Sequence, residues 1–168
     1  MKNLVLIGMM GVAKSTVGRA VAEKLGLTFI DGDDEIERVY GEKISDMFAR
    51  YGESEFRNRE KVVYADLSKR QNTVIACGGG VVLSPENMQN LSSGVIIRLT
   101  ATPEIIYERV KNNSDRPLIK DGGLEKIKQI ASAREHLYAK YARFSVDNTA
   151  LSVDECVNLV MKIYQQNA

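Results

Sequence analysis

Residues 4–16 read LVLIGMMGVAKST, an apolar run followed by a glycine-containing loop and a Lys-Ser-Thr sequence. This order is typical of a phosphate-binding loop, whose standard pattern is G-x-x-x-x-G-K-[ST] between a strand and a helix. Backbone N–H groups of such a loop surround an anion, and the following helix adds the positive end of its dipole. An ordinary strand-to-helix turn with chance glycines is the alternative. The stretch therefore predicts a nucleoside triphosphate site on a parallel sheet.

Two side chains of this loop have chemistry suited to phosphates. The Lys14 ammonium can reach the outer phosphates, and the Ser15 hydroxyl suits Mg²⁺, a hard cation that takes oxygen ligands. We expect the loop to bind ATP through Gly11, Val12, Ala13, Lys14, Ser15 and Thr16.

Ala13 stands where the standard pattern has its second glycine. A glycine there either takes a positive φ or lets the backbone approach a phosphate closely. With a positive φ, the alanine Cβ costs roughly 1–2 kcal/mol, which would weaken nucleotide binding by about tenfold. With a negative φ, the loop accommodates alanine without this cost. The sequence leaves both possibilities open.

Composition is that of a globular protein. The chain has 168 residues, 44% hydrophobic residues and a formal net charge of +1, which predicts one domain over residues 1–168. The balanced charge gives no reason to expect a nucleic-acid partner or a membrane surface. Cys77 and Cys156 fit no metal-binding spacing, and reduced thiols favour the cytoplasm.

Short apolar runs alternate with helical patterns along the whole chain. The strands are predicted at 4–8, 28–31, 73–77, 94–99 and 144–147. The helices are predicted at 14–25, 34–40, 44–51, 53–70, 85–91, 103–111, 124–141 and 153–165. This alternation predicts a three-layer α/β/α sandwich with a five-stranded parallel sheet.

Ligands of such sheets bind beyond the carboxyl ends of the strands. Asp31 and Asp33 close the second predicted strand, and Gly78, Gly79 and Gly80 follow the third. Asp31 is a candidate Mg²⁺ ligand, directly or through water, and Asp33 a candidate proton acceptor from an attacking hydroxyl. The alternatives are a helix N-cap with an acidic first turn for the aspartates, and a flexible turn for the glycines.

Three arginines complete the candidate site. Arg57 and Arg134 lie on predicted helices, and Arg116 lies in a polar segment with paired glycines. A guanidinium group is a natural partner for a carboxylate or a phosphate, although most arginines are solvated surface charges. We expect residues 112–123 to form a lid that brings Arg116 to the transferring phosphoryl group.

In this order and spacing, the motifs resemble the shikimate kinase family, which belongs to the P-loop kinases. The resemblance covers essentially the whole chain. It rests on the 8–16 loop, the 29–33 strand end, Phe56-Arg57 with Glu60, the triple glycine, Arg116-Pro117-Leu118, and Arg134-Glu135 with Leu137-Tyr138. It implies ATP-dependent phosphorylation of the shikimate 3-hydroxyl, with Mg²⁺, by a protein that is monomeric by family default.

The resemblance also implies roles for individual residues. Lys14 binds the β- and γ-phosphates, Ser15 and Asp31 hold Mg²⁺, and Asp33 orients or deprotonates the acceptor hydroxyl. Arg57, held by Glu60, and Arg134 bind the substrate carboxylate beside the Gly79 backbone. Arg116 stabilises phosphoryl charge, and Arg109 packs on the adenine. The alternatives are another small-molecule kinase, such as a gluconate kinase, and a ligand-binding homologue whose turnover is impaired by Ala13.

Overall fold

The structure, a computed structural model, describes residues 1–111 and 123–168. Its centre is a parallel five-stranded sheet with the strand order β2-β3-β1-β4-β5. The strands are β1 (Leu4–Ile7), β2 (Thr28–Asp31), β3 (Thr73–Ala76), β4 (Val95–Thr100) and β5 (Phe144–Asp147). Every residue of β1 and β3 is buried, as continuous apolar strands covered on both faces should be.

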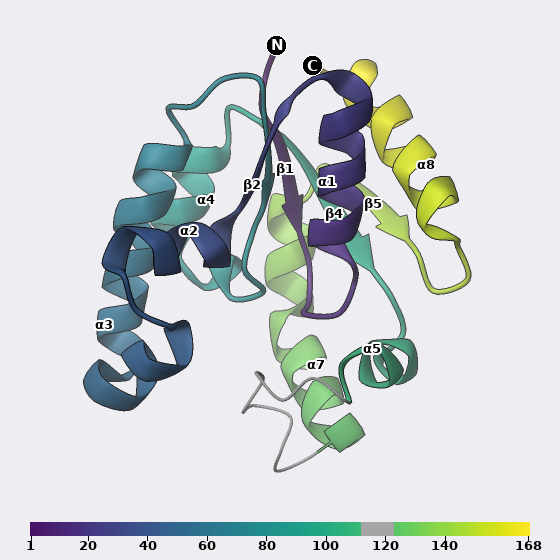
Figure 1. The fold of residues 1–168 in the computed structure, drawn as a ribbon. Coiled ribbons are helices and arrows are strands. Elements are labelled where there is room, and N and C mark those ends of the chain that lie inside the picture. Colours follow the sequence, from purple (N-terminus) through teal and green to yellow (C-terminus); the bar gives the residue numbers. More distant parts are fainter. Residues whose placement is uncertain (112–122) are drawn as a thin grey trace.

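Helices cover both faces of this sheet and make three layers. Helices α1 (Lys14–Leu25) and α8 (Val153–Gln165) lie side by side on one face, and α4 (Pro85–Leu91) and α7 (Gly123–Tyr141) lie on the other (Figure 1). Helix α8 begins with a capping box between Ser152 and Glu155, and α4 begins with a Ser84 cap followed by proline. The predicted fold is confirmed, with each strand boundary within one residue.

The remaining helices extend beyond the carboxyl edge of the sheet. They are α2 (Gly32–Tyr40), α3 (Ile44–Leu67) and α5 (Pro103–Val110). The two helices predicted at 44–51 and 53–70 form α3, which is kinked at the non-helical residue Gly52. A 3₁₀ turn, η1 (Val81–Leu83), follows the triple glycine and was not predicted.

The parallel topology places four segments at one edge of the sheet. The phosphate loop follows β1, Asp31 ends β2 with Asp33 in the first turn of α2, the triple glycine follows β3, and the chain leaves β4 toward α5. In Figure 1 this edge lies at the lower end of the sheet, between α3 and α5. Among the described residues, none of the helices is both long enough and apolar enough to cross a membrane.

Candidate active site

Side-chain donors bind the carbonyl groups of the phosphate loop. Lys14 Nζ donates to the Gly8 and Met9 carbonyl oxygens at 2.8 and 2.7 Å. Arg109 Nη1 donates to the Gly11 carbonyl at 3.2 Å, and Asn148 Nδ2 donates to that of Val12 at 2.7 Å. Because the carbonyl groups are engaged in this way, the loop can present N–H groups to an anion.

Ala13 has a left-handed backbone conformation, with φ 67° and ψ 28°. It immediately precedes α1, and its side chain makes no cap hydrogen bond. Of the two possibilities that the sequence left open, the structure has the one with positive φ. The loop therefore carries the strain of a left-handed non-glycine residue, roughly 1–2 kcal/mol.

Asp31 joins the phosphate loop to α2. Its Oδ1 caps the helix by accepting from the backbone N–H groups of Asp33 and Asp34 at 3.0 and 3.4 Å. Its Oδ2 accepts a hydrogen bond from the Ser15 hydroxyl. Asp31 is thus the helix cap, and one of its oxygens also lies beside Ser15. No cluster of three or more acidic, His or Cys side chains able to hold a metal occurs in residues 1–111 and 123–168.

Two glycines of the triple glycine leave room for charged side chains. A Cβ on Gly78 would lie 3.2 Å from Asp33 Cγ and closer still to Oδ1. A Cβ on Gly80 would lie 2.6 Å from Arg57 Nη1 and 2.8 Å from Arg57 Cζ. These distances are too short for a real Cβ, so glycine lets Asp33 and Arg57 pack against the backbone.

Gly79, the middle residue, lies between the phosphate loop and α7. An added Cβ would be 3.4 Å from Met10 N and 3.8 Å from Arg134 Nη1. Its carbonyl oxygen accepts a hydrogen bond from the Tyr138 hydroxyl at 2.5 Å. The structure therefore brings Asp33, Arg57, Gly79 and Arg134 together around the triple glycine, beside the phosphate loop.

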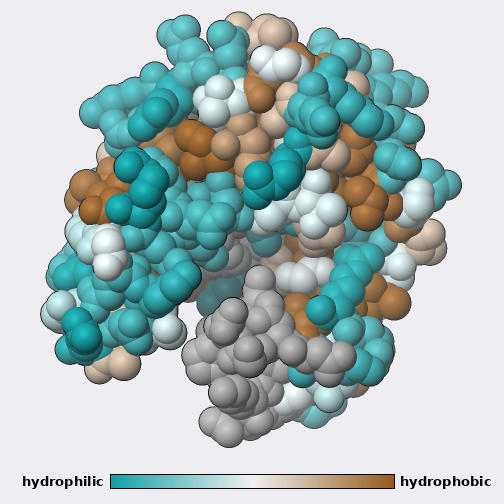
Figure 2. Space-filling model, in the orientation of Figure 1, coloured by the Kyte–Doolittle hydropathy of each residue, from teal (hydrophilic) through white to brown (hydrophobic). Residues whose placement is uncertain are grey.

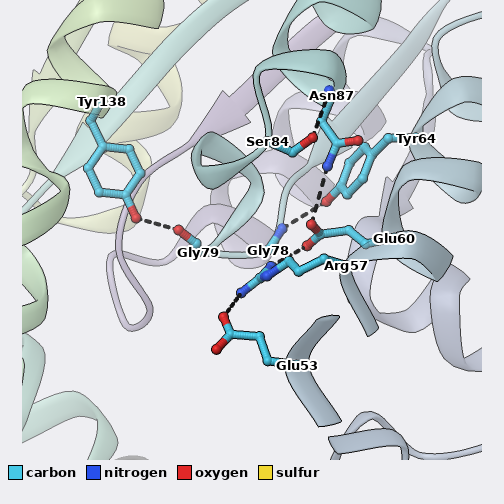
Figure 3. A network of polar contacts seen from close by, with 9 residues as sticks. All are labelled: Glu53, Arg57, Glu60, Tyr64, Gly78, Gly79, Ser84, Asn87 and Tyr138. Carbon is cyan, nitrogen blue, oxygen red and sulfur yellow. Dashed lines mark hydrogen bonds and ion pairs between the residues drawn. The ribbon is translucent and has the colours of Figure 1, made fainter. Parts of the chain in front are cut away.

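A buried network holds Arg57 in place (Figure 3). Arg57 Nη1 pairs with Glu60 Oε1 at 2.9 Å, and Nη2 lies 3.4 Å from Glu53 Oε1. Glu60 is 1% exposed, and its Oε2 accepts from Asn87 Nδ2 at 3.2 Å. Burial raises the pKa of the Glu60 carboxyl, and Arg57 counteracts this shift. The expected support of Arg57 by Glu60 is present.

Sequence reasoning gave no role to several residues that build the site. The buried Tyr64 hydroxyl accepts from Gly78 N at 2.9 Å, and burial raises the pKa of Tyr64 well above its ordinary value. Arg98 pairs with Glu135 through both guanidinium Nη atoms and lies 5.3 Å from the centre of the Tyr138 ring. Tyr138 stands one helical turn after Arg134, a spacing that would have singled it out.

The chemical roles expected of the site residues stay predictions, and two arginines show why. Arg109 contacts the phosphate loop and Asn148, and nothing in the structure tests its packing on adenine. Arg116 and almost all of the expected lid at 112–123 lie outside the described residues. Figure 2 shows a hollow beside α2 and α3 at the lower edge of the molecule, with hydrophilic residues along the α2–α3 side.

Comparisons with known proteins agree with one another. A family model described as shikimate kinase matches residues 10–165. A shikimate kinase of Pelotomaculum thermopropionicum is 44% identical, over 99% of this chain and 98% of that protein. One from Thermodesulfovibrio yellowstonii is 42% identical, over 99% of this chain and 96% of that protein.

Solved structures extend the agreement. A shikimate kinase from Acinetobacter baumannii in complex with shikimate has a TM-score of 0.94 at 32% identity, covering 99% of this chain and 94% of that one. A gluconokinase from Sinorhizobium meliloti has a TM-score of 0.65 at 16% identity, a likeness that concerns the fold alone.

Proposed function

The chain belongs to the shikimate kinase family, and from this premise we propose how its residues phosphorylate shikimate. The activity is transfer of the γ-phosphoryl group of ATP to the 3-hydroxyl of shikimate, giving shikimate 3-phosphate and ADP. Relatives that are named shikimate kinase, at 42–44% identity, favour this activity over that of a gluconate kinase. A ligand-binding homologue without turnover is also disfavoured.

One observation carries the assignment of residues. The three glycines place an acid, two guanidinium groups and the phosphate loop around one short backbone segment. Shikimate carries both a carboxylate and hydroxyl groups, so it needs cationic and acceptor groups close together. Phosphoryl transfer depends mostly on positioning and on electrostatic stabilisation of the transferring group.

On the acceptor side, Arg57 and Arg134 bind the substrate carboxylate, and the Gly79 backbone contacts the ring substituents. Asp33 accepts a hydrogen bond from the 3-hydroxyl and orients it toward the γ-phosphorus. The hydroxyl oxygen forms a bond to phosphorus while the bond to the β–γ bridging oxygen breaks. The hydroxyl proton passes to the Asp33 carboxylate, and ADP leaves.

On the nucleotide side, the residues of the phosphate loop bind ATP and Lys14 neutralises the outer phosphates. The adjoining oxygens of Ser15 and Asp31 form a donor set that suits Mg²⁺. When bound, this ion supplies positive charge to the phosphates. Arg109 packs on the adenine, and Arg116 stabilises charge on the transferring group. The protein acts as a monomer in the cytoplasm and needs no nucleic acid.

A coupled assay of ADP release tests this proposal. The purified protein with ATP and Mg²⁺ is given shikimate, gluconate or no acceptor. We expect ADP release to depend on shikimate, with a small background in the other two reactions. ADP release with gluconate but not with shikimate would contradict the assignment of shikimate as the substrate. ADP release that is independent of any acceptor would contradict the assignment of kinase activity.

A further inference from the structure

We propose that Asn148 is a positioning residue for the phosphate loop, because its amide holds the Val12–Ala13 peptide in the orientation needed for nucleotide binding. The inference rests on the proposed function of the loop. It concerns a residue that the motif does not include, since Asn148 lies 136 residues after Val12.

Asn148 is itself firmly placed. It is 3% exposed and directly follows β5, and its backbone N–H donates to the Thr100 carbonyl at 2.9 Å. Its Nδ2 donates to the Val12 carbonyl at 2.7 Å, and its Oδ1 accepts from Arg109 Nη1 at 3.0 Å. The backbone of Asn148 is therefore anchored at the ends of β4 and β5, and its side-chain amide connects this point to the loop after β1 and to Arg109.

The Val12 carbonyl matters because of its neighbour. A trans peptide is planar, so the direction of the Val12 C=O fixes the direction of the Ala13 N–H. Rotation of this peptide also changes the φ of Ala13, which is 67°. An alanine at positive φ tends to rotate toward negative φ, and that rotation would turn the N–H group away from a phosphate. The Asn148 hydrogen bond opposes this rotation.

The first test is Asn148→Ala with ADP as the probe, because ADP binding needs no turnover. Without the amide, a fraction of the molecules rotates the peptide, and the apparent affinity falls by that fraction. We expect the Kd for ADP and the KM for ATP to rise about tenfold, equivalent to about 1.4 kcal/mol. The KM for shikimate should stay within about twofold, since the acceptor site is untouched. An equal rise for ADP and shikimate would overturn the proposal.

Asn3→Ala is the matched control. Asn3 is also a buried asparagine, with 9% exposure. Its Nδ2 donates to the Arg70 carbonyl at 2.8 Å, and its Oδ1 accepts from the Thr73 N–H at 3.1 Å. It lies at the opposite, amino end of the sheet. Its loss should lower the melting temperature and leave the Kd for ADP unchanged. A rise in Kd as large as that of Asn148→Ala would show that any buried asparagine has this effect.

Asn148→Asp separates the two partners of the amide. An aspartate keeps an acceptor for Arg109, loses the donor and faces the Val12 carbonyl with a second acceptor. We expect this variant to bind ADP at least as weakly as Asn148→Ala. Binding like that of the unmodified protein would show that Arg109 is the partner that matters, and would overturn the proposal.

The decisive test is a double-mutant cycle with Ala13→Gly. Glycine has no strain at positive φ, so the loop in that background has little tendency to rotate. The loss from Asn148→Ala should then shrink from about tenfold to about twofold. A loss of the same size in both backgrounds would contradict the mechanism. If the unmodified protein did not phosphorylate shikimate, the proposed function would fail while these ADP measurements still decided the role of Asn148.

Discussion

The phosphate loop at residues 8–15 and the triple-glycine segment at Gly78–Gly80 both lie at the carboxyl edge of the sheet, yet they use glycine differently. At position 13 of the loop the requirement is conformational, because Ala13 has a positive φ of 67°. Gly11, with φ 74°, also has no room for a Cβ, which would lie 2.7 Å from Val110 Cγ1. In the triple-glycine segment the backbone is ordinary, since Gly80 has φ −91°. The requirement there is space for Asp33 and Arg57.

This difference predicts unequal tolerance of a methyl group. A Cβ at position 13 of the loop costs backbone strain, and the structure accommodates it there. A Cβ in the triple-glycine segment displaces a side chain that we place in the chemistry. Substitutions around the triple glycine should therefore change activity more than substitution of Ala13, and the following experiments test that order.

Asp33→Asn should have the largest effect. The amide keeps the shape beside Gly78 and cannot take the hydroxyl proton, so kcat should fall by about 10²-fold or more. The Kd for ADP should change little, which calorimetry can measure. Asp34→Asn, in the same first turn of α2, is the matched control and should keep its kcat. A near-normal kcat for Asp33→Asn would leave Asp33 with only a first-turn role.

Gly80→Ala should come next, acting through Arg57. Because the three nearest atoms to the added Cβ all belong to Arg57, the guanidinium must move. A charge-assisted hydrogen bond is worth roughly 1.5–3 kcal/mol, so the KM for shikimate should rise tenfold or more. The KM for ATP should stay unchanged in the same assays.

A second measurement checks the cause of this loss. Arg57→Ala alone should raise the KM for shikimate by a similar factor. Adding Gly80→Ala to Arg57→Ala should then have almost no further effect, because the obstacle is gone. Additive losses would mean that Gly80 is needed for its backbone rather than for space.

The two regions also differ in how far the sequence predicts them. The phosphate loop is contiguous, so its pattern after an apolar run was enough to place Lys14, Ser15 and the helix behind them. The second region joins α2, α3, η1 and α7, and sequence spacing cannot tell which residue packs against which glycine. The resemblance supplied the carboxylate-binding role of Arg57 and Arg134, whereas the hydrogen bonds of Tyr64, Asn87 and Tyr138 needed coordinates.

Ala13 marks another limit of the sequence. The local pattern does not give the sign of its φ. The carbonyl before it accepts a hydrogen bond from Asn148, which follows β5 and is distant in the sequence. Helix α3 is different, because the break predicted between 44–51 and 53–70 falls at Gly52, which has a non-helical conformation in the structure. Local patterns set the elements, and long-range packing sets their final geometry.

Glu60→Gln should separate function from stability in the triple-glycine region. The glutamine loses the ion pair that holds Arg57, so the KM for shikimate should rise a few-fold. Burial raises the pKa of Glu60, so the stability associated with its protonated form is lost as pH rises through that pKa. The variant should therefore gain stability over the unmodified protein between about pH 4 and about pH 8. Urea unfolding at both pH values measures the difference in free energy of unfolding between the variant and the unmodified protein. A variant that becomes less stable relative to the unmodified protein as pH rises would contradict the prediction.

Ala13→Gly should have the smallest effect on activity. Whether it strengthens or weakens ADP binding tests the comparison between the phosphate loop and the triple-glycine segment. We expect the Asn148 hydrogen bond to hold Ala13 at positive φ in both the free and the bound loop, so relief of strain stabilises the two alike. The ADP affinity should then rise by less than about threefold, well below the tenfold limit set by 1.4 kcal/mol of strain. Relief of roughly 1–2 kcal/mol is partly offset by about 0.4–1 kcal/mol of added entropy in the unfolded chain. The usual helix penalty for glycine does not apply, since Ala13 precedes the first helical residue.

The melting temperature should therefore stay the same or rise slightly. Asn72→Gly is the control, because Asn72 also has positive φ, 53°, at the amino end of β3. It should leave ADP binding unchanged. If Ala13→Gly instead tightened ADP binding tenfold with no gain in stability, the free loop would be leaving its left-handed conformation. The strain at Ala13 would then limit nucleotide binding directly. A methyl group would impair ligand binding in both regions, and the phosphate loop and the triple-glycine segment would differ only in the size of that effect.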